Sequence, residues 1–109
     1  IKDQVEAFIA GKGFLDPSIS QTKIVEDFNL GNVKYLSQTI KKEYGKKFPV
    51  FIKDLRIDYL KENFEKEFRD LKKNEIATKL GFGSYRTFKD YVEQSNGISL
   101  NEFLRKLEE

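Results

Sequence analysis

The chain has 109 residues, a formal net charge of +2, no cysteine and no histidine. This length suits one compact domain, and the composition excludes disulfide frameworks, thiolate or imidazole metal sites and a catalytic histidine base. No apolar run approaches the ~18 residues that cross a bilayer. We therefore expect no metal ion, no cofactor, no enzymatic activity and no membrane contact. The start at Ile1 and the lack of methionine indicate a piece of a longer protein.

Apolar residues recur at spacings of three and four, interrupted by only two prolines and seven glycines. This pattern predicts an all-α fold of seven helices. Six of the expected helices cover about residues 2–11, 32–44, 48–64, 74–80, 84–94 and 99–107. The remaining one, second along the chain, follows Ser20 and carries Ile24, Val25 and Phe28. Ser20 and Ser99 are expected N-caps, the latter in a capping box with Glu102, and Gly45 ends the third helix.

An internal repeat at an offset of 52 residues organises the chain. The first copy comprises Ile24, Phe28, Gly31, Leu36, Ile40, Gly45, Phe48, Phe51 and Ile52; the second comprises Ile76, Leu80, Gly83, Phe88, Val92, Gly97, Leu100, Phe103 and Leu104. Two unrelated amphipathic helices could match at apolar positions, but the aligned glycines favour a true repeat. Each copy reads as a short helix, a glycine-containing turn and a longer helix, which is a helix-turn-helix unit. We predict one domain: residues 19–52 form the first unit with the start of a linker helix, 53–71 the rest of the linker helix and a loop, and 72–109 the second unit.

The longer helix of the first copy has an outward face suited to a major groove of DNA. A helical wheel turns Val33, Leu36, Ile40 and Tyr44 inward. The opposite face carries Lys34, Gln38 and Lys41, flanked by Ser37 and Lys42. Between residues 32 and 53 there are six lysines and one acid, a net charge of +5. A lysine-rich face is often only solvated surface, but within the repeat it favours DNA binding, with Lys41, Lys42, Lys46 and Lys47 on phosphates.

The second copy has a mixed outward face. Tyr85, Phe88 and Val92 are expected inward, whereas Arg86, Asp90 and Glu93 point outward with Lys89 beside them. The acids predict that the first unit supplies most of the affinity for DNA. They also support the alternative of a helical protein-interaction module that has lost DNA binding. RNA is a weaker rival, since a helix in a groove suits B-form duplexes.

Two further features belong to this interpretation. Tyr35 and Tyr85 open the two recognition helices and are the aromatic residues expected near DNA. The fourth helix, about 25 Å long, has apolar residues on more than one side. It is expected to hold the recognition helices about one duplex turn apart, in successive major grooves.

The chain resembles the DNA-binding domain of AraC/XylS-type transcription regulators from about Ile19 to Leu104. The run 35–57, YLSQTIKKEYGKKFPVFIKDLRI, is similar to the first module and linker of that family. A second block is similar to its second module: Ile76-Ala77, Gly81-Phe82, Ser84, Phe88, Gly97-Ile98-Ser99 and Phe103. The resemblance implies a seven-helix domain that binds double-stranded DNA through two helix-turn-helix modules.

The resemblance also implies roles for particular residues and for the parent protein. Bases would be read from Lys34, Ser37 and Gln38, and in the second module from Tyr85, Arg86, Lys89 and Asp90. Asp90 departs from the family, where a basic residue is common. Arg56 matches a linker arginine interpreted as structural, pairing with acids. The family joins this domain to a sensor or dimerisation domain, which is here expected upstream of Ile1. The resemblance thus implies a DNA-binding domain in the cytoplasm, in a parent protein that can be tethered to a membrane.

Overall fold

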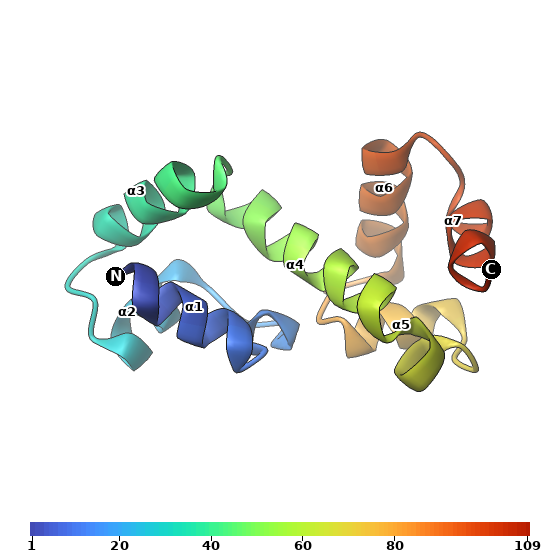
Figure 1. Ribbon diagram of the computed structural model, residues 1–109, viewed down its shortest axis with the longest axis horizontal. Coiled ribbons are helices and arrows are strands. Elements are labelled where there is room, and N and C mark those ends of the chain that lie inside the picture. The colour runs from blue at the N-terminus through green and yellow to red at the C-terminus, as the bar shows by residue number, and fades with distance from the viewer. The chain divides into compact units, whose positions relative to one another are not determined.

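A computed structural model describes all residues, 1–109, and contains seven α-helices and no strand. The helices are α1 (Lys2–Ala10), α2 (Gln21–Phe28), α3 (Val33–Tyr44), α4 (Phe48–Asn63), α5 (Lys73–Lys79), α6 (Tyr85–Asn96) and α7 (Leu100–Leu107) (Figure 1). A 3-10 turn, η1 (Gly13–Leu15), and a π-helical turn, η2 (Phe64–Phe68), complete the chain. The predicted all-α fold of seven helices is confirmed. None of the helices is both long enough and apolar enough to span a membrane.

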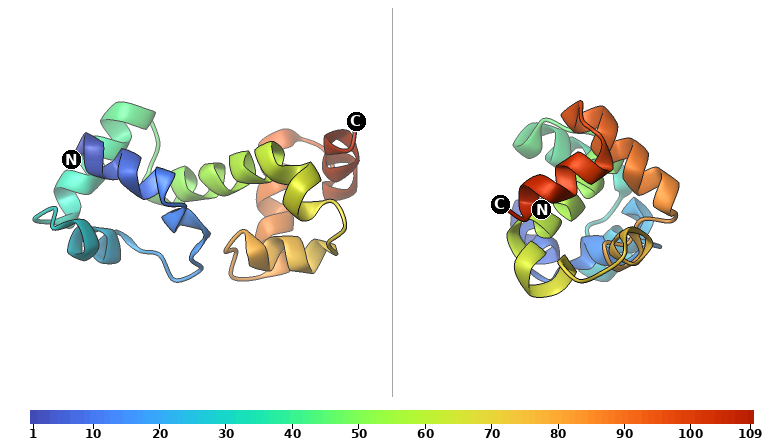
Figure 2. Two further views of the ribbon diagram at one scale, coloured as in Figure 1. Left: turned by 60° about the horizontal axis from the view of Figure 1, so that its bottom comes forward. Right: turned by 90° about the vertical axis from the view of Figure 1, so that its right-hand side faces the viewer.

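The chain divides into two compact units, Ile1–Leu55 and Arg56–Glu109, and the boundary falls within α4. In the first unit α2 packs against α3, and in the second α5 packs against α6, which also contacts α7. The orange α6 and the red α7 lie side by side in both views of Figure 2. Each unit therefore contains one short helix that packs against the longer helix following it, α2 against α3 and α5 against α6.

The start of the longer helix is built in the same way in both units. The Asn32 side chain accepts a hydrogen bond from the Tyr35 backbone N–H, and Ser84 accepts one from the Thr87 N–H. Both caps have extended backbone with φ of −153°. A short polar side chain here satisfies one of the amide groups that the first turn leaves unpaired. The two capping hydrogen bonds thus lie 52 residues apart, like the repeat in the sequence.

The turns before α3 and α6 repeat as well. The Leu30 N–H donates to the Val25 carbonyl, and the Phe82 N–H donates to the Ala77 carbonyl, each at 3.0 Å. This bond, five residues long, is the outer bond of a Schellman turn, which needs a left-handed residue. Asn29 (φ 54°) and Gly81 (φ 89°) supply that conformation at equivalent positions.

The aligned glycines Gly31 and Gly83 differ in conformation, although they match in sequence. Gly31 has a φ of 88°, whereas Gly83 does not have a positive φ. The first turn therefore contains a second left-handed residue that the second turn lacks. The glycines after the recognition helices do agree, because Gly45 and Gly97 both have φ of 68° and close their helices.

Equivalent apolar residues form the core of each unit. Ile24, Leu36, Ile40 and Phe51 are buried in the first unit; Ile76, Phe88, Val92 and Phe103 are buried in the second. Burial of each such side chain contributes about 1.5–3 kcal/mol before the entropy of ordering is subtracted. This core fixes the second helix of each pair against the first and leaves its other side in water.

The linker helix α4 ends one residue earlier than expected, at Asn63, and continues as the π-helical turn η2. Phe64 and Phe68 are both buried in η2. The Tyr59 hydroxyl donates a hydrogen bond of 2.5 Å to Glu67. Burial and the Glu67 carboxylate raise the pKa of Tyr59 to about 12. The wider turn thus brings a carboxylate and two aromatic rings against the end of α4.

Candidate nucleic-acid interface

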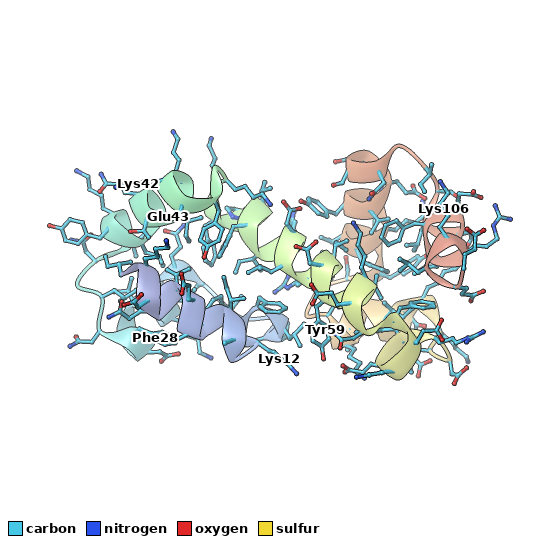
Figure 3. All side chains as sticks on the ribbon, in the orientation of Figure 1. Lys12, Phe28, Lys42, Glu43, Tyr59 and Lys106 are labelled. Atoms are coloured by element: carbon cyan, nitrogen blue, oxygen red, sulfur yellow. The ribbon has the colours of Figure 1, made fainter.

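The outward face of α3 is a cluster of cations with few acidic neighbours. Four lysines on or just after α3 are exposed and form no ion pair: Lys34, Lys41, Lys42 and Lys47. The single acid of this segment, Glu43, lies 3.6 Å from the Lys2 ammonium of α1. Lys42 and Glu43, neighbours on α3, are labelled in Figure 3. The face therefore presents uncompensated positive charge to solvent.

Lys46, which is also expected on phosphate, differs from these four lysines because it forms an ion pair. Its ammonium is 2.7 Å from the Asp54 carboxylate of α4, and its side chain is half-buried. An ion pair at the protein surface contributes about 0–1 kcal/mol. Lys46 could still reach an anion, but it would have to share its charge with Asp54, whereas Lys47 would not.

Ser37 and Gln38 lie at different depths on α3. Gln38 is exposed, but Ser37 is half-buried and its hydroxyl donates a hydrogen bond of 2.8 Å to the Gln21 side chain of α2. This bond ties the first residue of α2 to the outward edge of α3. The side chain of Gln21 was not among the residues expected at the site, and the signal for it was its place at the start of α2.

The first residues of the two recognition helices are exposed, which corrects the inward placement of Val33 and Tyr85. Their exposed fractions are 37% and 38%, and Tyr35 reaches 52%. A helical wheel gives only the direction of a side chain around the helix axis and does not tell whether another element covers it. Tyr35 and Tyr85 are therefore accessible to a ligand. Their expected place near DNA requires this.

The outward face of α6 carries paired charges. The Arg86 guanidinium lies 3.6 Å from the Asp90 carboxylate, and the Lys89 ammonium lies 3.2 Å from Glu93. Both pairs span one helical turn, a spacing that stabilises an isolated helix by a few tenths of a kcal/mol. Arg86 nevertheless keeps a side chain that is 90% exposed. The second face is thus close to neutral, whereas the first is strongly positive.

Glu93 has a structural role that the sequence did not reveal. Its second carboxylate oxygen accepts a hydrogen bond of 2.9 Å from the Leu100 backbone N–H at the start of α7. This bond and the Lys89 ammonium lower the pKa of Glu93. The equivalent position in the first unit is Lys41, which cannot accept a hydrogen bond. The acid that suggested repulsion of phosphate therefore joins α6 to α7.

Arg56 is buried, with 7% of its surface exposed, in agreement with its interpretation as a structural residue. Its guanidinium carbon lies 5.3 Å from the centroid of the Phe82 ring, within the range of a cation–π contact. Phe82 belongs to the turn before α6. Arg56 thus supports the turn that positions the second recognition helix and does not face solvent.

Known proteins resemble this chain in sequence and in fold. No family model matches the chain. YesN of Bacillus subtilis (strain 168), described as an uncharacterized transcriptional regulatory protein, is 29% identical over 92 residues, which cover 84% of this chain and 25% of YesN. The chain therefore spans about a quarter of the length of that relative.

Two solved structures share the fold. The C-terminal domain of AraT, a response regulator from Geobacillus stearothermophilus, has a TM-score of 0.78 and 24% identity, covering 96% of this chain and 83% of that one. The C-terminal domain of the two-component response regulator yesN from Fusobacterium nucleatum has a TM-score of 0.76 and 22% identity, covering 99% and 97%. These two structures show that the fold is shared. The description of YesN as a transcriptional regulatory protein agrees with the AraC/XylS resemblance.

Proposed function

We propose that this chain binds double-stranded DNA as the DNA-binding domain of an AraC/XylS-type transcription regulator, with α3 and α6 as its recognition helices. The observation that carries the proposal is the positive surface of α3 and the turn after it, where four exposed lysines have no acidic partner. Such a face attracts the phosphate rows on either side of a major groove. The relatives named as regulators support the same conclusion.

The residues of α3 divide into two roles in this proposal. Lys34, near the N-terminus of the helix, and Gln38 one turn later read base edges, where lysine suits guanine and glutamine suits adenine. Ser37 contributes together with Gln21, since the two share a hydrogen bond. The lysines that follow contact phosphates: Lys41, Lys42, Lys46 and Lys47. Tyr35, half exposed at the start of the helix, packs beside the duplex.

The α6 helix contributes less affinity. Arg86 and Lys89 approach the DNA with their charges already paired to Asp90 and Glu93. Tyr85, at the first position of α6, takes a place near the backbone. We propose that α6 enters the major groove next to the one occupied by α3, with α4 as the linker between the two helices.

The proposal extends to the organisation of the parent protein. Residues 19–52, 53–71 and 72–109 form the first module, the linker and the second module of one domain. An upstream sensor or dimerisation domain controls it, and the short span of YesN that the chain matches supports additional sequence in the parent. In this proposal the domain acts by binding double-stranded DNA in the cytoplasm and not by catalysis.

Selection of bound sites from a random duplex library tests this function directly. Two boxes about one turn apart are expected, with the second weakly specified. With the selected duplex, Lys34→Ala is expected to lower affinity about 5-fold or more, the usual loss for a base contact. Lys66→Ala removes an exposed lysine of η2 outside the interface and serves as the control.

The dependence on salt separates DNA binding from its alternative. Four lysine–phosphate contacts give a slope of about −3.6 in log affinity against log salt, at about −0.9 for each contact. A weak duplex signal that stays flat from about 50 to 200 mM salt would instead support the protein-interaction module. Equal affinity for an RNA duplex of the same sequence would also contradict the proposal, since its major groove is too narrow for a helix.

A further inference from the structure

The second unit contains an open cavity of about 800 Å³ that the proposed DNA contacts leave largely unused. It lies between η2, the loop that follows, α5, α7 and the first residue of α6. Small-molecule sites in proteins have volumes of roughly 300–1,000 Å³. The π-helical turn η2 forms part of the wall, and such turns occur frequently at functional sites. The cavity thus has the size and setting of a ligand site.

The lining combines an apolar floor with a cationic rim. Phe64, Leu71, Ile76 and Leu104 supply apolar surface. Four cations also line the cavity: Arg69, Lys72, Lys73 and Arg105. A single acid, Glu108, lines it near the C-terminus. A ligand that fits this surface has an apolar body and a negatively charged group.

The two lysines are the free cations of the rim. Arg69 lies 2.7 Å from Glu65, and Arg105 is hydrogen-bonded to Glu102. The ammonium groups of Lys72 and Lys73 have no acidic partner, and the Glu75 carboxylate accepts only the backbone N–H of Lys72. Their long side chains can follow an apolar wall and place the ammonium group at its edge. An anionic group in the cavity would therefore meet two unpaired charges.

We propose that this cavity binds an anionic amphipathic small molecule, with its apolar part against Leu71 and Leu104 and its carboxylate, sulfonate or phosphate against Lys72 and Lys73. Tyr85 also lines the cavity and is the first residue of the recognition helix α6. A bound ligand therefore contacts the end of α6 that is proposed to face DNA. The coupling of ligand to DNA rests on the proposed function, but the ligand site itself does not.

Titration with 8-anilinonaphthalene-1-sulfonate tests the site, because this probe joins an aromatic body to one sulfonate. One probe per chain is expected to bind, with amide NMR shifts at Leu71, Tyr85 and Leu104. The double variant Lys72→Ala/Lys73→Ala is expected to weaken its binding about 5-fold or more, as two partly exposed ion pairs predict. Its affinity for the uncharged analogue N-phenyl-1-naphthylamine should stay unchanged.

The matched control replaces Lys66 and Lys106 by alanine, two exposed lysines of the same unit that do not line the cavity. Equal weakening in both double variants would show general attraction of the anion and overturn the proposal. NMR shifts confined to another surface, or the absence of 1:1 binding, would also overturn it. The NMR spectrum of each variant shows whether it is folded.

A second measurement separates the ligand site from its coupling to DNA. With the selected duplex, saturating probe is expected to change DNA affinity at least about 3-fold in the unaltered protein, and not in the Lys72→Ala/Lys73→Ala variant at the same probe concentration. If the probe binds but DNA affinity does not change, the coupling is refuted and the site stands. If no duplex binds at all, the proposed function fails, while the probe titration still decides the site.

Discussion

Replacing Asp90 by asparagine is expected to strengthen DNA binding. Asp90 lies 3.6 Å from the Arg86 guanidinium on the outward face of α6, where the two side chains are 48% and 90% exposed. In the proposed complex this carboxylate both occupies Arg86 and repels the phosphates. The substitution removes the charge and keeps the size of the side chain. Arg86 then becomes as free as its equivalent in the first unit, Lys34.

The size of the effect follows from these exposed fractions. An exposed pair one turn apart contributes about 0.3–0.5 kcal/mol, so the free energy of unfolding should fall by no more than this. A freed arginine displaces about one more counterion, which makes the salt slope more negative by about 0.9. Between 50 and 200 mM salt, the advantage of the variant over the unaltered protein should therefore shrink about 3.5-fold.

Fluorescence anisotropy with the selected duplex measures both quantities across this range. Asp58→Asn is the matched control, because Asp58 is an exposed acid of α4 without an ion-pair partner, and it makes the same change in net charge. An equal gain in both variants would mean that net charge alone matters. A loss of affinity in Asp90→Asn would refute the reasoning, since it would show that the carboxylate itself contacts a base such as cytosine.

Four further results are expected. Lys34→Ala should reduce DNA affinity more than Arg86→Ala in a binding titration, because the charge of Arg86 is already paired; the reverse order would contradict the unequal modules. Glu93→Gln should flatten the acid limb of stability measured by denaturation at each pH. In the unaltered protein the pKa of Glu93 lies below its ordinary value of 4.5. Its contribution to stability is therefore complete above pH 4.5 and is lost as the pH falls through the lower pKa of the folded state. Tyr59→Phe should remove a phenol whose pKa is raised from 10.0 to about 12 by burial and by Glu67, and ultraviolet absorbance at high pH should show the missing titration. The variant should also lose less stability as the pH rises through that interval. Gly97→Ala should destabilise the fold by about 1–2 kcal/mol in chemical denaturation, because φ is +68° although no atom lies within 4 Å.

The secondary structure was largely predictable because its signals are local. The caps at Ser20 and Ser99 accept the hydrogen bonds expected of them, and Gly45 ends α3 in the left-handed conformation. Two short elements were not expected: the 3-10 turn η1, and η2, where the helical pattern continues but the backbone widens. Nothing in the apolar spacing distinguishes a π-helical turn from an α-helix over five residues.

The outward residues of the candidate site were largely predictable, but the ion pairs that its charged side chains form were not. The periodicity of α3 and α6 identifies the outward residues, with errors only at the first position of each helix, Val33 and Tyr85. Which lysine is free depends on the opposite element. Lys46 faces Asp54 of the next helix, whereas its neighbour Lys47 does not.

The sequence by itself determined the helices, the 52-residue repeat and the excess of positive charge around α3, because propensity, periodicity and net charge depend on residues close along the chain. The tertiary structure decided what each polar side chain does. Ser37 bonds to Gln21, and Glu93 holds the N–H of Leu100. Such hydrogen bonds require donor and acceptor to meet within about 3 Å, and their distance depends on how the helices pack rather than on the order of residues.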